Sequence, residues 1–244
     1  MPQASDRLII ALDDESFDTA LKLVNTTKLY ASTFKVGLSL FCAHGPKIVE
    51  AIRALGVDVF LDLKLCDIPM QVEKTIKALN GLSPRFLTVH AWGGEAMLKA
   101  ALLAANESDV RILVVSVLTS LEDQDYRALG FSCSASEGVL NLSKLAFNVG
   151  AKNFVSSGLE VRALKQMLGQ ECFVVCPGVR GAFDQSQDQR RFVSAKQAIM
   201  AGADAIVVGR PITRSRDVCE AARLINLEIE CAMKQEIPEA TYSL

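Results

Sequence analysis

The chain has 244 residues, half of them hydrophobic, and a formal net charge of −2 at pH 7. This length is sufficient for a large hydrophobic core, and an α/β barrel of this size commonly forms one domain. The near-neutral charge argues against a nucleic-acid-binding surface, and we find neither a secretory signal nor an apolar run of roughly 18 residues, so we expect a soluble cytoplasmic protein.

Short apolar runs alternate with longer amphipathic ones along the whole chain. We predict strands at 7–12, 33–38, 57–65, 85–91, 111–118, 152–157, 172–176 and 204–208. We predict helices at 16–27, 45–55, 70–80, 95–106, 136–149, 159–168, 193–201 and 214–235. The alternation indicates a parallel sheet covered by helices, and eight such units favour a closed (β/α)8 TIM barrel over an open doubly wound sheet. We therefore treat residues 1–244 as a single barrel domain with a frayed tail at 238–244.

Cysteine and histidine spacings indicate neither a disulfide framework nor a metal site. The seven cysteines are odd in number and include no C-x-x-C pair, so we expect reduced and mostly buried thiols. The two histidines, His44 and His90, do not have the spacing of zinc ligands. We expect no metal and no dinucleotide cofactor, because no G-x-G-x-x-G follows the first predicted strand.

Charged residues interrupt the predicted strand 57–65. Because side chains alternate faces along a strand, Asp62 and Lys64 share a face with Phe60, whereas the opposite face is aliphatic. In a barrel the aliphatic face packs against the helices, so Asp62 and Lys64 point inward near the carboxyl end of the strand, where active sites of this fold lie. A structural ion pair is the alternative, but perturbed charges cluster at functional sites.

Two further charges, Asp13 and Lys35, stand at the first and second predicted strands. Asp13 ends the run LIIAL and is equally well explained as a solvated loop charge. Lys35 lies between Phe34 and Val36 and is harder to place at the surface. Two carboxylates and two lysines would then meet at one barrel mouth and nearly cancel in charge.

Glycine and arginine follow the last two predicted strands. Gly209 and Arg210 come after strand 204–208, and Arg180 lies in P-G-V-R after strand 172–176. Glycine lets backbone N–H groups approach an anion, and arginine binds phosphate bidentately. These residues also suit ordinary turns, but barrel phosphate sites commonly use these two loops. The long polar loop 181–191 follows one of them, and we interpret it as a lid.

The motifs, taken in order, resemble those of orotidine 5′-monophosphate decarboxylases over nearly the whole chain. The central one is D-x-K-x-x-D-I-P at 62–69. The others are ALD (11–13), FKVG (34–37), LTS (118–120), PGVR (177–180), DQRR (188–191) and VGRPIT (208–213). The resemblance implies a TIM barrel that decarboxylates orotidine 5′-monophosphate to uridine 5′-monophosphate in pyrimidine biosynthesis without a cofactor.

The resemblance also implies roles for individual residues. Lys64 would protonate C6 as carbon dioxide leaves. Lys35, Asp62, Lys64 and Asp67 would form a network of alternating charge, with Asp67 contributed by the partner subunit of a homodimer. Asp13 and Lys35 would hold the ribose, and Gln189 would bridge base and phosphate. The remaining residues expected near the substrate are Ile68, Gln71, Thr119, Ser120, Ser157, Arg180, Gly209 and Arg210.

The chain departs from the family pattern at several positions. Cys66 stands where histidine is frequent, and we expect it to face the helix layer. Met70–Gln71 replaces a common Asn–Thr, so Gln71 would substitute for a threonine that contacts ribose. Gly181 and Trp92 replace a frequent proline and a usually small residue.

Two other functions fit part of the pattern. A magnesium-dependent decarboxylase of a 3-keto sugar phosphate has a similar D-x-K-x-x-D motif, but it uses an added acidic ligand and is not expected to carry PGVR with DQRR. A catalytically inactive barrel that only binds a nucleotide would retain the phosphate turns, but the complete set of four charges argues against it.

Overall fold

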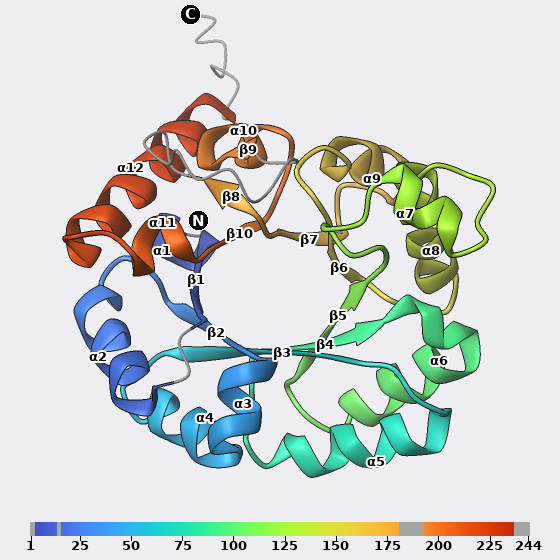
Figure 1. Cartoon of the computed structure of the whole chain (residues 1–244), viewed down its shortest axis with the longest axis horizontal. Helices are drawn as coiled ribbons and strands as arrows, with labels where there is room; N and C mark the ends of the chain where they lie inside the picture. Colours follow the sequence, from blue (N-terminus) through green and yellow to red (C-terminus); the bar gives the residue numbers. More distant parts are fainter. Residues whose placement is uncertain (1–2, 14–15, 181–192, 237–244) are drawn as a thin grey trace, which may run out of the picture.

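Eight parallel strands close into a barrel (Figure 1). The structure is a computed structural model that describes residues 3–13, 16–180 and 193–236. The barrel strands are β1 (Leu8–Leu12), β2 (Thr33–Gly37), β3 (Asp58–Leu65), β4 (Phe86–His90), β5 (Arg111–Val115), β6 (Asn153–Val155), β7 (Phe173–Cys176) and β10 (Ala205–Val208). They pair in the closed order β1-β10-β7-β6-β5-β4-β3-β2. The predicted fold class, a (β/α)8 barrel, is confirmed.

The longer helices surround the barrel as an outer ring in Figure 1. The helices of the described ranges are α1 (Ala4–Arg7), α2 (Phe17–Thr27), α3 (Leu38–His44), α4 (Pro46–Arg53), α5 (Pro69–Asn80), α6 (Gly94–Ala105), α7 (Asp123–Ala128), α8 (Ala135–Asn148), α9 (Val161–Leu168), α10 (Ala195–Met200), α11 (Arg210–Thr213) and α12 (Val218–Glu236), with a short 3₁₀ helix, η1 (Ala91–Gly93). None of the helices in the described ranges is long and apolar enough to cross a membrane. The predicted lid 181–191 and tail 238–244 lie outside the described residues.

The barrel strands are buried on both faces, as parallel strands covered by helices generally are. Inward-facing side chains form a small cluster: Ile9, Ala11, Phe60, Phe86, Leu113, Val175, Ala205 and Val207. Within it Phe86 packs edge-on against Phe60 and stacks on Phe173, with ring centroids 6.0 and 5.6 Å apart. These rings fill the barrel interior, so the space left for a ligand is at the mouth.

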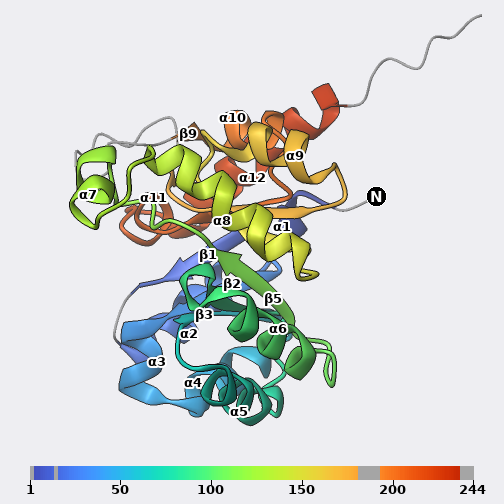
Figure 2. The same cartoon turned by 90° about the vertical axis from the view of Figure 1, so that its right-hand side faces the viewer.

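Several short elements were not predicted, and they include four that lie near the carboxyl ends of the barrel strands. Helix α3 directly follows β2, α7 follows β5, and β8 (Val179–Arg180) pairs in parallel with β9 (Val193–Ser194). Figure 2 shows α3, α7 and α11 at one end of the barrel, opposite the N-terminus. Since α3 and α11 directly follow the carboxyl ends of β2 and β10, this end is the barrel mouth.

The expectation of mostly buried thiols is wrong. All seven cysteines are free, but only Cys172 and Cys176 are buried. Cys66 is exposed and is not covered by the helix layer; it is the first residue after β3, which ends at Leu65. Burial raises the pKa of the Cys176 thiol to about 12, with a smaller contribution from the charge of Glu160.

An ion pair closes the opposite end of the barrel. The ammonium of Lys165, on α9, lies 2.7 Å from the carboxylate of Asp204, just before β10. It also donates to the carbonyls of Cys172 and Gln170, at 2.6 and 3.2 Å. The same Asp204 oxygen accepts from the backbone N–H of Val174 at 2.7 Å. Through these contacts the ion pair links α9 to the residues at the amino ends of β7 and β10.

We predict that Lys165→Met lowers the free energy of unfolding by about 3 kcal/mol, because Asp204 is left charged and unpaired. Lys99→Met is the matched control, since Lys99 pairs with Glu95 at the exposed surface and such pairs contribute less than about 1 kcal/mol. Urea unfolding of both variants measures the difference. Equal midpoints would show that the buried pair does not stabilise this end.

Candidate active site

Four charged side chains form a row across the carboxyl ends of β1, β2 and β3. The Lys64 ammonium lies 2.8 Å from Asp62 Oδ1, and the Lys35 ammonium lies 3.6 Å from Asp62 Oδ2. Lys35 also lies 3.2 Å from Asp13 Oδ1. Asp62 and Lys35 are the most enclosed, with side chains 12% and 14% exposed, whereas that of Asp13 is 56% exposed. Charges alternate along the row, so each of these partly buried groups has a neighbour of opposite sign.

Two glycines allow this close packing. A Cβ at Gly209 would lie 3.0 Å from Asp13 Oδ2 and 3.5 Å from the Ala11 side chain. A Cβ at Gly37 would lie 3.3 Å from the Lys35 nitrogen. The glycine after β10 therefore lets the backbone that leads into Arg210 approach the charged row.

The backbone of β3 is irregular at Asp62 and Lys64, the two residues that this strand contributes to the charged row. Leu61 pairs with Leu87, but the next pair is Leu65 with Val89, so β3 uses two more residues than β4 between these points. Within this bulge Lys64 adopts a φ of 49°, in the left-handed region. Non-glycine residues are uncommon in that region, and strained backbone of this kind clusters at functional sites.

Two adjoining cavities open beside the row. One, of about 230 Å³, is lined mainly by polar and backbone groups: Ala11, Asp13, Lys35, Asp62, Pro177, Gly178, Val179, Val207, Gly209, Arg210 and Pro211. The other, of about 120 Å³, is mainly apolar: Lys35, Phe60, Asp62, Lys64, Val115, Val117, Leu118, Thr119, Val155, Pro177 and Val207. They share Lys35, Asp62, Pro177 and Val207. An anionic group beside Arg210 and a flat apolar group beside Lys64 would fit the two chambers.

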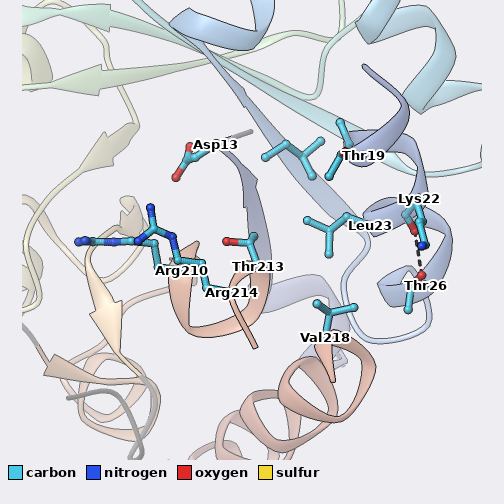
Figure 3. Close-up of a pocket in the computed structure, with 11 residues that line it drawn as sticks. Asp13, Thr19, Lys22, Leu23, Thr26, Arg210, Thr213, Arg214 and Val218 are labelled. Carbon is cyan, nitrogen blue, oxygen red and sulfur yellow. Dashed lines mark hydrogen bonds between the residues drawn. The ribbon is translucent and has the colours of Figure 1, made fainter. Parts of the chain in front are cut away.

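A third cavity, of about 450 Å³, adjoins the polar chamber through Asp13 and Arg210 (Figure 3). Its walls come from β1, α2, α11 and the start of α12. Besides Asp13 and Arg210 they carry Leu12, Thr19, Ala20, Lys22, Leu23, Thr26, Thr213, Arg214 and Val218. Asp13 and Arg210 thus lie between this cavity and the polar chamber and line both.

The comparisons with known proteins decide the family. Residues 6–225 match the profile described as "Orotidine 5'-phosphate decarboxylase / HUMPS family". The chain belongs to this family. The orotidine 5′-phosphate decarboxylase of Sphingopyxis alaskensis is 43% identical over 218 residues, which cover 89% of this chain and 96% of that protein. That of Saccharophagus degradans is 41% identical over 225 residues, covering 91% and 94%.

A solved structure agrees in fold. The crystal structure of orotidine 5′-phosphate decarboxylase from Lactobacillus acidophilus superposes with a TM-score of 0.80 at 36% sequence identity. The match covers 92% of this chain and 99% of that one. The resemblance that the motifs indicated, and the assignment to the decarboxylases that it carried, are confirmed.

The structure brings some of the residues implied by the family motifs to the cavities and leaves others apart. Asp13, Lys35, Asp62, Lys64, Thr119, Gly209 and Arg210 all line one chamber or both. Ser120 is exposed and lines neither chamber. Ser157 is buried, and its hydroxyl accepts from the backbone N–H of Leu159 at 3.2 Å. Of Arg180 only the backbone is described, paired with Ser194, and Gln189 lies outside the described residues.

Asp67 and the residues after it stand apart from the row. Asp67 is exposed, and its Oδ1 accepts from the backbone N–H of Ile68 at 2.6 Å. Within the described part of the chain it forms no ion pair with Lys35 or Lys64. Ile68 and Met70 are 60% and 54% exposed, and Gln71 is exposed too. This segment therefore presents apolar surface next to an acidic side chain.

His90 is a neighbour of the row that the sequence motifs did not indicate. It ends β4 in phase with Phe86 and is buried. Its Nδ1 accepts from the Trp92 backbone N–H at 3.3 Å, which requires that nitrogen to be unprotonated. Burial, and secondarily the charge of Lys64, lowers the pKa of His90 below its ordinary value. A lowered histidine pKa stabilises the fold above the unfolded pKa of about 6.5, and this stability is lost as the pH falls.

We predict that Lys64→Met raises the pKa of His90 towards its ordinary value, because the variant removes a nearby positive charge but keeps the length of the side chain. Titration of the imidazole proton resonances by nuclear magnetic resonance measures this, and His44→Gln assigns the two histidine signals. Lys99→Met on α6 should leave the pKa unchanged. No change with Lys64→Met would mean that the ammonium does not act on His90.

Proposed function

We propose that this enzyme decarboxylates orotidine 5′-monophosphate to uridine 5′-monophosphate without a cofactor, in the cytoplasm, and that Lys64 protonates C6. The observation that carries the proposal is the Lys64 ammonium held 2.8 Å from Asp62 at the edge of the apolar chamber, with Arg210 in the adjoining polar one. Family membership and the names of the relatives support the substrate.

Loss of carbon dioxide leaves negative charge on a ring carbon. A fixed ammonium beside that carbon stabilises the charge as it develops and then donates a proton to it. In this proposal Asp62 anchors Lys64, and its own charge, next to the substrate carboxylate, disfavours the ground state relative to the transition state. The alternating row keeps both groups charged before the substrate arrives.

The rest of the substrate would occupy the polar chamber. Arg210 and the backbone at Gly209 would bind the phosphate, with Arg180 and Gln189 completing that end. Asp13 and Lys35 would bind the ribose, and Thr119, Ser120 and Ser157 would lie near the pyrimidine. Phosphate binding far from the reacting carbon would contribute its energy to the orientation of the base.

We further propose a homodimer with shared active sites. In it Asp67 extends the charge row of the partner subunit, and Ile68 and Gln71 reach that subunit's substrate. The exposed position of Asp67 and the apolar surface at Ile68 and Met70 support this arrangement, because an exposed apolar patch next to a site is typical of an interface.

The magnesium-dependent sugar phosphate decarboxylase is the second candidate. Within the described ranges no group of three or more His, Cys, Asp or Glu side chains is placed to hold a metal. The added acidic ligand that this activity needs is therefore not found beside Asp62 and Asp67. Turnover of each substrate with and without EDTA distinguishes the two activities.

We predict that Lys64→Ala lowers the turnover of orotidine 5′-monophosphate, assayed in EDTA, by roughly 10³-fold or more. Binding of uridine 5′-monophosphate, measured by calorimetry, should persist, because its phosphate contacts do not involve Lys64. Lys99→Ala, which removes an exposed lysine on α6, should keep full activity. Parental turnover in Lys64→Ala would remove Lys64 from its proposed role, and loss of parental activity in EDTA would favour the magnesium enzyme.

The shared site predicts complementation between two inactive variants. When Lys64→Ala and Asp67→Ala proteins are mixed and allowed to exchange subunits, each hybrid dimer contains one site with both residues intact. Random exchange then restores about a quarter of the parental sites. If Asp67 served its own subunit, every site would lack one residue and the mixture would stay inactive.

A further inference from the structure

Thr88 lies under the charged row, on the inner face of β4. It is in phase with Phe86 and His90, and its side chain is completely buried. Neither the sequence motifs nor the comparisons give this residue a role. Its position between the aromatic interior and the mouth brings its hydroxyl to both Asp62 and Lys64.

The hydroxyl makes two hydrogen bonds in opposite senses. It donates to Asp62 Oδ1 at 3.0 Å and accepts from the Lys64 backbone N–H at 2.8 Å. The same Asp62 oxygen accepts from the Lys64 ammonium at 2.8 Å. Since a hydroxyl has one proton to donate, these contacts fix its orientation. One buried oxygen therefore contacts both the backbone of Lys64 and the carboxylate that holds its side chain.

The bulge in β3 explains why Lys64 needs such a contact. In regular parallel pairing its N–H would bond to a backbone carbonyl of a neighbouring strand, but pairing with β2 ends at Asp62 and the register with β4 shifts between Leu61 and Leu65. Lys64 also has a left-handed φ of 49°, which a non-glycine residue retains only when its surroundings hold it. The Thr88 hydroxyl replaces the missing carbonyl as the partner of this N–H.

We propose that Thr88 is the positioning residue that holds Lys64 in its left-handed conformation and so directs its ammonium at the reacting carbon. This rests on the proposed role of Lys64 as proton donor. Thr88 lines neither chamber, so it acts through Lys64 and Asp62 and not by touching the substrate. Its effect therefore falls on the chemical step, and substrate affinity, which depends on groups around Arg210, is little changed.

Thr88→Val removes the hydroxyl and keeps the shape of the side chain. We expect kcat to fall about 10- to 100-fold, because misplacement of a charged group by the loss of its hydrogen bonds has effects of this order, while KM stays within about threefold. Thr88→Ser keeps the hydroxyl and should retain most of the activity. Thr27→Val is the matched control: Thr27 is equally buried on α2, and its hydroxyl donates to the Leu23 carbonyl, so its loss should leave kcat unchanged.

Hydrogen exchange of the Lys64 amide, followed by nuclear magnetic resonance, tests the contact without any assay of activity. The amide should be protected in the parent and in Thr88→Ser, and should exchange faster in Thr88→Val. In a Lys64→Ala background, Thr88→Val should cause no further loss of kcat, because both changes remove the same function.

The results separate the two proposals. Parental kcat in Thr88→Val, equal losses in the Val and Ser variants, or an unprotected Lys64 amide in the parent would each overturn the role of Thr88. Parental turnover in Lys64→Ala would instead overturn the role of Lys64. In that case the amide exchange still decides whether Thr88 holds the bulge. If Thr88→Val does not fold, the Lys64 amide exchange in the parent and in Thr88→Ser still tests the contact. An unprotected amide in either protein would overturn the role of Thr88.

Discussion

The site depends on how the negative charge of one carboxylate, that of Asp62, is neutralised by its neighbours. Asp62 lies in the mouth of the barrel with its side chain only 12% exposed, and it accepts from Lys64 and Thr88 through one oxygen while Lys35 lies near the other. A carboxylate enclosed to this degree is costly unless it is paired and hydrogen-bonded. Both lysines and the buried threonine meet that requirement by direct contact with Asp62, and the bulge in β3 places Lys64 for it.

Polar and apolar surfaces are separated at the mouth because adjacent strands end differently. β10 and β7 are followed by a glycine and a proline, whose turns expose backbone beside Arg210. β5 and β6 contribute valines beside Lys64. The phosphate end of a nucleotide and its base would thus meet different strands, while the charged row on β1, β2 and β3 borders both.

The alternation of side chains in 57–65 was enough to predict that Asp62 faces the cavity, because a strand buried on both faces leaves no other place for a charge. It was not enough to predict the bulge, since register depends on pairing with β4 and not on β3 alone. For the same reason the sequence did not indicate Thr88, although its phase with Phe86 is visible in F-L-T-V-H. The spacing of His90 excludes a zinc site, but its position in phase with Phe86 and Thr88 becomes informative only once β4 is placed beside β3.

The sequence patterns that mark the ends of helices and strands also left some elements and residues unpredicted. At the start of α7 the Asp125 carboxylate accepts from the backbone N–H of Glu122. This acidic start is visible in the sequence, but it lies in a polar stretch without a clear apolar period. The prediction for Cys66 failed because this residue lies past the last residue of β3, where the helix layer no longer covers the chain. Asp67 could be placed outside the strand from the sequence, but a single chain does not reveal which subunit's row it extends.

The row of alternating charges constrains how this sequence can change over generations. Loss of Lys35 alone leaves Asp13 and Asp62 facing each other, and loss of Asp62 alone leaves two ammonium groups without their common partner. Removal of a neighbouring pair of opposite sign leaves no such excess and is less destabilising than the sum of the single losses. In a related protein that has lost this activity, we therefore expect the charged residues to be replaced in neighbouring pairs of opposite sign. The pair that remains would show which pair was replaced first.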